Sequence, residues 1–385
     1  MLSGQPYPEL DRDDIVLRKV PSLDLYRDDD PFRTPRLSEF RDWIDVLEFA
    51  HMKTGGFPEP LSFSLRALRE LRKRRDAFDV VHDNQVLGYG NLGIARLGLP
   101  LVTSIHHPIS VDRRIEIEAA KGLRQQFGKR RWYGFVKMQA RVAERVGPIL
   151  TVSGSSKRDI VRDFQAPPEQ VHILPLGVDT RYFYRRGERV PGRIVAVASA
   201  DSPLKGVATL LRSVAKLATE RDVHVVIVSR PTPCGPTEKL VGELSLGDRV
   251  RFVSGISDEQ LGELLAGAEI AVVPSLYEGF SLPAVEHMAS GAPLVASRTG
   301  ALPEVVGDAA ILVEPGDVEE LAAVLRRLHD SPGERERVGA AGYARVQERF
   351  TWSAVAQATV RHYKDAIARR AGAARKEHDT ADRGL

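Results

Sequence analysis

The chain has 385 residues, of which 43% are hydrophobic and 28% charged, an ordinary composition for a globular protein of two or three domains. Its formal net charge of +3 is too close to neutral to indicate a nucleic-acid-binding protein. A single cysteine, Cys234, excludes an internal disulfide framework and suits a reducing compartment; with no apolar run of about twenty residues, we expect a cytoplasmic protein.

The first predicted strand, residues 15–20, lies between two acidic runs, Asp11-Arg12-Asp13 and Asp28-Asp29-Asp30. Such runs imitate metal-binding aspartate pairs. The segment around them is poorly patterned, however, so we favour a solvated charged surface.

From there on, apolar strands alternate with amphipathic helices, the pattern of doubly wound parallel sheets and hence of an α/β fold. In the first half the predicted strands are residues 78–82, 101–106, 149–153 and 171–175. A second series consists of residues 193–199, 223–229, 251–255, 269–273, 293–297 and 310–313, followed by helices at 318–329, 332–349 and 351–370. The pattern therefore predicts two similar sheet domains.

Polar side chains follow two strands of the first half. Asp83, Asn84 and Gln85 come after the strand ending at His82 and are candidates for holding a polar ligand. His106 and His107 follow the strand at residues 101–105, at a carboxyl end where ligands of open α/β sheets bind. Neighbours in an extended chain point to opposite sides, so the two histidines cannot share one site. No third ligand has convincing spacing, and we expect no metal.

The glycines of Gly88-Tyr89-Gly90-Asn91-Leu92-Gly93 have the spacing of a dinucleotide-binding fingerprint. The motif stands apart from the strand before it, and the next strand ends in histidines instead of an acid. We therefore predict a helix that packs closely on its neighbour, and keep a nicotinamide enzyme only as a distant alternative.

Residues 121–145 form a basic stretch with aromatic neighbours. Eight lysines and arginines stand there against the single acid Glu144, and Trp132, Tyr133 and Phe135 lie among them. Such a stretch suits an anionic membrane surface. The alternative is an exposed helix whose aromatic side chains pack inward.

Two loops of the second half are candidate ligand sites. The first, Ser199-Ala200-Asp201-Ser202-Pro203-Leu204-Lys205-Gly206, offers the Lys205 ammonium to a phosphate. The second joins the strand at 269–273 to a helix, and the backbone N–H groups around Gly279, Phe280, Ser281 and Leu282 would present positive charge to an anion. Glu278 lies in its turn, and Glu286, after seven intervening residues, can accept hydrogen bonds from ribose hydroxyls.

The second loop, from Pro274 through Glu278-Gly279-Phe280-Ser281-Leu282-Pro283 to Glu286, resembles the donor-sugar motif of the retaining GT-B-fold glycosyltransferases related to glycogen synthase. The resemblance covers roughly residues 15–370. It implies that Glu278 orients the transferred sugar, that Glu286 holds the ribose, that Lys205 binds the diphosphate, and that His106 steadies the sugar from the other domain. It also implies a metal-independent reaction without a cofactor.

The resemblance further implies a domain division. We expect an acceptor-side domain at residues 1–176, a linker at 177–190, a donor domain at 191–350, a crossing helix at 351–370 and a disordered tail at 371–385, with the two domains facing a cleft. Two departures stand out: the family's arginine before the lysine is Ala200 here, and the usual first strand, glycine loop and second strand have no counterpart, which predicts a truncated start.

The expected reaction is transfer of a hexosyl group from a nucleotide sugar to a sugar, polyol or lipid-linked hydroxyl acceptor, with retention of configuration. Peripheral membrane contact through residues 121–145 would suit a lipid-linked acceptor, and no nucleic-acid partner is expected. A nucleotide-sugar epimerase and a non-catalytic nucleotide-sugar-binding protein of the same fold are the alternatives. The sequence leaves the base, the sugar, the acceptor and the oligomeric state open.

Overall fold

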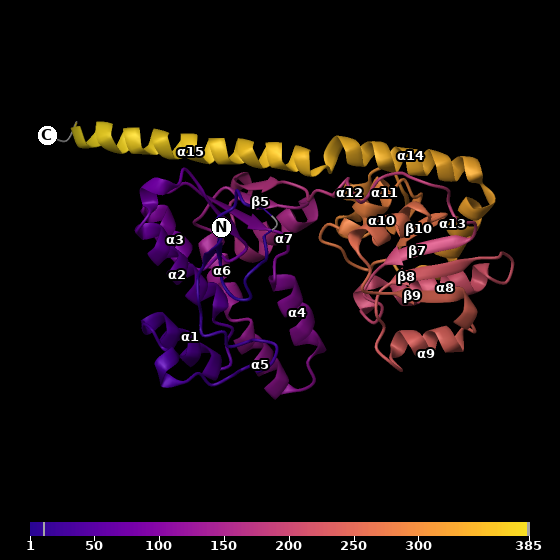
Figure 1. Cartoon of the computed structure of the whole chain (residues 1–385), viewed down its shortest axis with the longest axis horizontal. Coiled ribbons are helices and arrows are strands. Elements are labelled where there is room, and N and C mark those ends of the chain that lie inside the picture. The colour runs from indigo at the N-terminus through magenta and orange to yellow at the C-terminus, as the bar shows by residue number, and fades with distance from the viewer. Residues whose placement is uncertain (11, 383–385) are drawn as a thin grey trace. The chain divides into compact units, whose positions relative to one another are not determined.

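Two compact units make up the chain, which a computed structural model describes at residues 1–10 and 12–382 (Figure 1). Unit 1 comprises residues 1–151, 156–173 and the chain from Val360 onward. Unit 2 comprises Val152–Ser155 and Leu174–Thr359. Each unit has its own parallel sheet with helices around it, so the predicted α/β class with two such sheets is confirmed.

The sheet of unit 1 has four parallel strands in the order β3-β4-β5-β6. They are β3 (Val81–Asn84), β4 (Leu101–Ile105), β5 (Ile149–Thr151) and β6 (Val171–Ile173). Every residue of β4 and β5 is buried, as expected for central strands covered on both faces. Among the described residues β3 pairs only with β4, so it is an edge strand, and its burial alternates.

Helices flank this sheet. They are α1 (Trp43–Lys53), α2 (Glu59–Arg72), α3 (Tyr89–Arg96), α4 (Ser110–Ala119), α5 (Leu123–Trp132), α6 (Phe135–Ala143) and α7 (Gly154–Phe164). The core between β4, β5 and α6 contains Ile105, Ile149 and Val142, all fully buried.

The strand predicted at residues 15–20 differs from expectation. A two-residue β2 (Arg18–Lys19) pairs in parallel with β1 (Leu2–Ser3) and does not join the main sheet. The side chains of Arg18 and Lys19 are exposed, whereas a strand inside a parallel sheet must bury both faces. Of the acidic runs, Asp29 and Asp30 pair with Arg27 on the surface, and Asp11 lies outside the described residues.

The glycines of the dinucleotide-like motif bring α3 against α2. A Cβ atom added at Gly90 would lie 2.0 Å from the Ser64 carbonyl oxygen, and one added at Gly93 would lie 2.4 Å from a methyl carbon of Leu68. Side chains cannot approach so closely, so the packing of these helices requires glycine. The predicted closely packed helix is confirmed.

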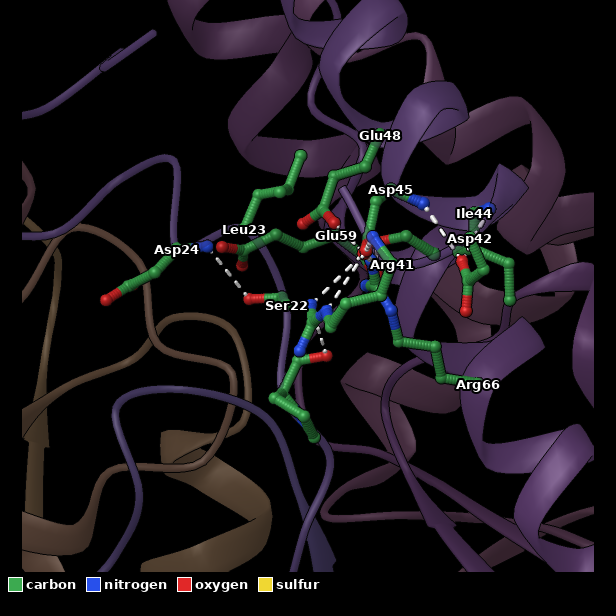
Figure 2. Close-up of polar contacts among 12 residues, drawn as sticks. Ser22, Leu23, Asp24, Arg41, Asp42, Ile44, Asp45, Glu48, Glu59 and Arg66 are labelled. Carbon is green, nitrogen blue, oxygen red and sulfur yellow. Dashed lines mark hydrogen bonds and ion pairs between the residues drawn. The ribbon is translucent and has the colours of Figure 1, made fainter. Parts of the chain in front are cut away.

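A buried ion-pair cluster joins α1 to α2 (Figure 2). Arg66 is 3% exposed and donates hydrogen bonds to Asp45 Oδ1 at 2.6 Å and to Glu48 Oε2. Burial raises the pKa of Glu48 although Arg66 opposes the shift. The carboxyl group of nearby Glu59 has no ion-pair or hydrogen-bond partner among the described residues, and burial, with the charges of Glu48 and Asp24, raises its pKa to about 7.

The sheet of unit 2 has six parallel strands in the order β12-β11-β10-β7-β8-β9. They are β7 (Arg193–Val197), β8 (His224–Val228), β9 (Val250–Val253), β10 (Ile270–Val273), β11 (Leu294–Ser297) and β12 (Ile311–Val313). The chain runs outward from β7 to β9 and then returns to β10 on the other side of β7. The strand order therefore reverses between β7 and β10, the place where open α/β sheets bind ligands at the carboxyl ends of their strands.

Helices cover both faces of this second sheet. They are α8 (Val207–Leu217), α9 (Pro236–Glu243), α10 (Asp258–Ala266), α11 (Leu282–Ala289), α12 (Leu302–Val306), α13 (Val318–Asp330) and α14 (Pro332–Arg349). Alternate residues of β7 enter different cores, with Ile194 and Ala196 in one and Val195 in the other. The predicted linker at 177–190 packs on this unit, because Val178 and Phe183 are buried in its core.

The last helix, α15 (Trp352–Asp382), begins in unit 2 and belongs to unit 1 from Val360. Within unit 1 its Tyr363 hydroxyl lies 2.5 Å from His82 Nδ1. The helix continues to Asp382 instead of ending near residue 370, and four of the twelve added residues are alanine, the strongest helix former. Residues 383–385 of the expected tail lie outside the described residues. In the described part of the chain, no helix combines the length and the apolar character needed to cross a bilayer.

Candidate active site

Lys205 and Glu278, predicted from separate loops, meet at the switch point of the unit 2 sheet. Lys205 Nζ lies 2.8 Å from Glu278 Oε1, and the Ser275 hydroxyl donates a hydrogen bond to the same oxygen at 2.7 Å. Glu278 is 8% exposed, whereas the Lys205 side chain is 34% exposed. The carboxylate is thus held in place, and the ammonium group remains accessible to a ligand. Ser275 was not anticipated from the sequence.

Two glycines allow the loops of Lys205 and Glu278 to pack closely enough for this contact. Gly206 has a φ of +64°, and a Cβ atom there would lie 1.9 Å from the Pro274 carbonyl oxygen. The neighbouring Leu204 carbonyl accepts a hydrogen bond from Leu276 N at 2.8 Å, which fixes the Lys205 loop against the end of β10. Gly300, with a φ of +53°, leaves space for the Glu278 carbonyl oxygen, which a Cβ atom would approach to 2.2 Å.

The N-terminus of α11 has backbone donors without partners in the described part of the chain. The backbone N–H groups of Phe280, Ser281 and Leu282 have no hydrogen-bond acceptor among the described residues. Ser281 has a φ of +85°, an uncommon conformation for a residue other than glycine, and its hydroxyl caps Ala284 N at 3.4 Å. Free donors together with the helix dipole give this end the partial positive charge that suits an anion.

Glu286 lies on α11 and is half-buried. Its carboxylate has no ion-pair or hydrogen-bond partner in the part of the chain that the structure describes. Burial, and to a smaller extent the charge of Asp258, raises its pKa to about 7. An unpaired carboxylate in this place is an open acceptor for ligand hydroxyl groups.

A further contact to this site comes from Ser153. The Ser153 hydroxyl donates a hydrogen bond to the Gly279 carbonyl oxygen at 2.6 Å. Ser153 belongs to unit 2 although it follows β5 of unit 1 in the chain. It therefore helps to hold the loop that precedes α11.

In unit 1 the two histidines have different partners, as their adjacency predicted. Asn84 Oδ1 lies 2.8 Å from His106 Nε2, and His107 Nε2 lies 3.0 Å from an Asp112 carboxylate oxygen. Burial lowers the pKa of His106, so its ring is neutral at neutral pH. Asn84 therefore accepts from Nε2–H and leaves Nδ1 as a hydrogen-bond acceptor.

The three predicted acceptor residues have distinct environments. Gln85 Oε1 accepts from His106 N and Gln85 Nε2 donates to the His107 carbonyl, both at 2.8 Å, so this side chain supports the histidine loop. Asp83 accepts a hydrogen bond from Leu87 N at 3.1 Å, and burial raises its pKa to about 6. All three residues line a cavity of about 1000 Å³ between β3 and α2 that Glu59 also borders.

The basic stretch at 121–145 covers α5 and α6. Tyr133 and Phe135 are buried, and Trp132 packs on the Phe57 ring with 5.1 Å between centroids, so these aromatic side chains point inward. By contrast Leu123 and Phe127 of α5 are 86% and 71% exposed.

The chain has two Rossmann-like units. In unit 2 a lysine, two glutamates and a helix N-terminus with free N–H groups lie where the strand order reverses. These features define a glycosyltransferase of the GT-B fold. A family model described as glycosyl transferases group 1 matches residues 181–345, and one described as glycosyltransferase family 4 matches residues 25–182. The chain belongs to this glycosyltransferase family, as the resemblance implied.

A relative from Mycolicibacterium hassiacum, named MMP alpha-(1->4)-mannosyltransferase, is 58% identical over 372 residues, which cover 96% of this chain and 90% of the relative. Among solved structures, sucrose-phosphate synthase from Thermosynechococcus elongatus aligns with a TM-score of 0.62 at 23% identity, over 79% of this chain and 78% of that one. Anabaena HepE in complex with UDP also aligns with a TM-score of 0.62, at 18% identity, over 77% of this chain and 82% of that one. These structures share the fold.

Proposed function

We propose that this glycosyltransferase moves a hexosyl group from a nucleoside diphosphate sugar to a hydroxyl acceptor, with retention at the anomeric carbon and without a metal ion. The observation that carries the proposal is the Lys205–Glu278 pair beside the free N–H groups of α11. The M. hassiacum relative is named a mannosyltransferase, which makes a mannosyl donor the first to test.

The chemistry follows from the charges. When the bond between the anomeric carbon and the diphosphate oxygen breaks, negative charge develops on the diphosphate. Lys205 and the N–H groups of Phe280, Ser281 and Leu282 are positioned to stabilise that charge without rearrangement. Glu278 accepts hydrogen bonds from the hydroxyl groups of the transferred sugar and so orients it. Gly279 contributes the loop backbone. Glu286 accepts hydrogen bonds from the ribose hydroxyl groups.

Unit 1 supplies the remaining groups. The neutral His106 ring, held by Asn84, steadies the transferred sugar. Asp83 and Asn84 hold the acceptor, a sugar, a polyol or a lipid-linked alcohol, and Gln85 fixes the loop that presents His106.

A nucleotide-sugar-binding protein without turnover is a second candidate, and Ala200 favours it, because the family has a cation at that position. Such a protein would bind the nucleotide but release no sugar from it. Turnover of UDP-glucose, GDP-mannose and ADP-glucose, measured as nucleoside diphosphate release, separates the two.

The Glu286 assignment predicts pH-dependent nucleotide binding. The carboxylate has a pKa of about 7 in the free protein, and its ionised form accepts the ribose hydrogen bonds. The ionised fraction rises from about one tenth at pH 6 to about nine tenths at pH 8. We therefore expect the affinity for one of UDP, GDP and ADP, measured by calorimetry, to increase roughly tenfold across this interval.

The control removes the titrating group. Glu286→Gln should bind the same nucleotide more weakly at pH 8, and its affinity should depend little on pH. Any pH dependence that remains in this variant reports the titration of the nucleotide phosphate and is subtracted from that of the wild type. Glu286→Ala should lose thermal stabilisation by the nucleotide. A folded wild-type chain that none of the three nucleotides stabilises would refute the donor site.

We also propose a cytoplasmic location with peripheral membrane contact through residues 121–145. The exposed Leu123 and Phe127 lie one helical turn apart on α5, with Arg124 and Arg130 exposed beside them. Vesicles of phosphatidylcholine with about 30% phosphatidylglycerol should bind the chain severalfold more tightly than pure phosphatidylcholine. Leu123→Ser with Phe127→Ser should abolish the difference, whereas Leu37→Ser, at a site 91% exposed elsewhere in unit 1, should not. Equal binding to both vesicles would exclude this contact.

A further inference from the structure

The candidate donor site of unit 2 has little net positive charge for a ligand that carries a diphosphate. The ammonium group of Lys205 is already paired with Glu278. Asp201, in the same loop as Lys205, accepts hydrogen bonds from Thr232 and Thr237, which lower its pKa to about 2 and keep it ionised. The free N–H groups of α11 contribute only partial charges. A further cation is needed to offset the negative charge of the ligand.

Position 200 does not provide it. Ala200 is 6% exposed, and its backbone N–H donates a hydrogen bond to the Ser229 hydroxyl at 2.9 Å. Ser229 follows β8, and the next residue in the chain is Arg230. The strand end that carries Arg230 therefore lies directly beside the loop that carries Ala200 and Lys205.

Hydrogen bonds fasten these two loops together. Asp201 Oδ2 accepts from Thr232 N at 2.6 Å, and Asp201 Oδ1 accepts from Thr237 N at 3.2 Å. The Thr237 hydroxyl donates to the Ala200 carbonyl oxygen at 2.8 Å. With the Ser229 contact, these bonds hold Arg230 at the carboxyl edge of the sheet, on the side of β7 opposite to β10.

The guanidinium of Arg230 is not committed to a protein partner. The side chain is exposed and has no ion pair in the described part of the chain. Its one hydrogen bond there runs from Nε to the Ser254 hydroxyl and is long, at 3.5 Å. So weak a contact leaves the donors of the guanidinium available to a phosphate, which they match in geometry.

We infer that Arg230 supplies the second cation for the diphosphate of the donor and so replaces an arginine at position 200. The inference rests on the proposed nucleotide-sugar donor. The inference also explains the hydrogen bonds of Asp201. Its negative carboxylate reduces the positive charge of the site, but it holds the loop of Arg230, whose guanidinium adds positive charge. Lys205 and Arg230 then approach the diphosphate from neighbouring strand ends.

The test compares ligands with and without the diphosphate. We would measure by calorimetry the affinities of wild type, Arg230→Ala and Arg230→Lys for UDP, GDP, ADP and the corresponding nucleosides. Arg230→Ala should bind the preferred diphosphate about 10-fold to 100-fold more weakly, with the nucleoside affinity unchanged within about twofold. Arg230→Lys should retain part of the affinity, because it keeps the charge.

A transplanted cation makes the test specific. Ala200→Arg combined with Arg230→Ala should regain most of the diphosphate affinity, and Arg251→Ala, which removes an exposed arginine of β9, should change nothing. Equal losses for nucleoside and diphosphate would mean that Arg230 contacts the base and would overturn the inference. Unchanged diphosphate binding by Arg230→Ala would overturn it while leaving the donor site intact. A wild-type chain that binds no nucleotide would overturn both.

Discussion

Replacement of Lys205 by alanine is expected to lower kcat/KM for sugar transfer by about 100-fold to 1000-fold, the usual effect of removing one preorganised donor from developing negative charge. Lys205 is the cation fixed at the switch point between β7 and β10, 2.8 Å from Glu278 Oε1. Because diphosphate charge grows as the anomeric bond breaks, the ammonium group should bind the transition state more tightly than the donor. Most of the loss should therefore appear in kcat.

The substitution also removes the partner of a buried carboxylate, so stability must be measured beside activity. Lys205→Ala and Lys205→Arg should be compared by thermal unfolding, nucleotide affinity and steady-state release of nucleoside diphosphate. Lys216→Ala serves as the matched control, since Lys216 on the adjacent α8 pairs with the exposed Glu319. If folded Lys205→Ala retained kcat within about twofold, electrostatic stabilisation by this residue would be disproved.

The sequence predicted the parts of the fold that depend on local pattern. Each strand of the unit 2 sheet lies within two residues of its predicted bounds, because apolar runs such as Ile270–Val273 are buried on both faces and end in clear turn residues. The Glu278 and Lys205 loops were chosen as candidates for the same reason, since ligand residues of an open sheet follow strand ends.

Contacts between distant segments could not be predicted in this way. Two examples are Ser275, which bonds to Glu278, and Asp201, which accepts from Thr232 and Thr237. Both are small polar residues in loops, where most such residues are solvated or cap helices. Their roles depend on strand order, which places β7 between β8 and β10. Gln85 was predicted to bind a ligand but fixes the His106 loop, a distinction that depends on which side chain lies opposite it.

The second prediction of large effect concerns the stability of unit 1. Arg66→Ala should lower the free energy of unfolding by about 3–5 kcal/mol at pH 7, because it leaves the buried Glu48 carboxylate without its ion-pair partner. Asp45 and Glu48 are both 1% exposed, and Arg66 bonds to each of them (Figure 2). Truncation thus removes the ion-pair partner of Glu48, whereas Asp45 keeps its pair with Arg41. Urea unfolding gives the difference, followed by the fluorescence of Trp43 and Trp132 in a Trp352→Phe background that removes the tryptophan of unit 2.

The pH dependence identifies the cause. Burial acts to raise the pKa of Asp45, but the hydrogen bonds and charges of Arg41 and Arg66 outweigh it, so the pKa of Asp45 is lowered in the folded protein. The ion pairs of Asp45 therefore stabilise the wild type at pH values above the pKa of Asp45 in the unfolded chain. This contribution is lost as acid protonates Asp45. In Arg66→Ala the unpaired Glu48, whose pKa burial raises and Arg66 no longer opposes, regains stability by protonation as the pH falls from 7 to 5. The deficit against wild type should shrink over that interval. Arg69→Ala, which breaks the more exposed pair with Asp42, should cost under about 1 kcal/mol. A deficit of equal size at both pH values would assign the Arg66 effect to lost packing instead of charge.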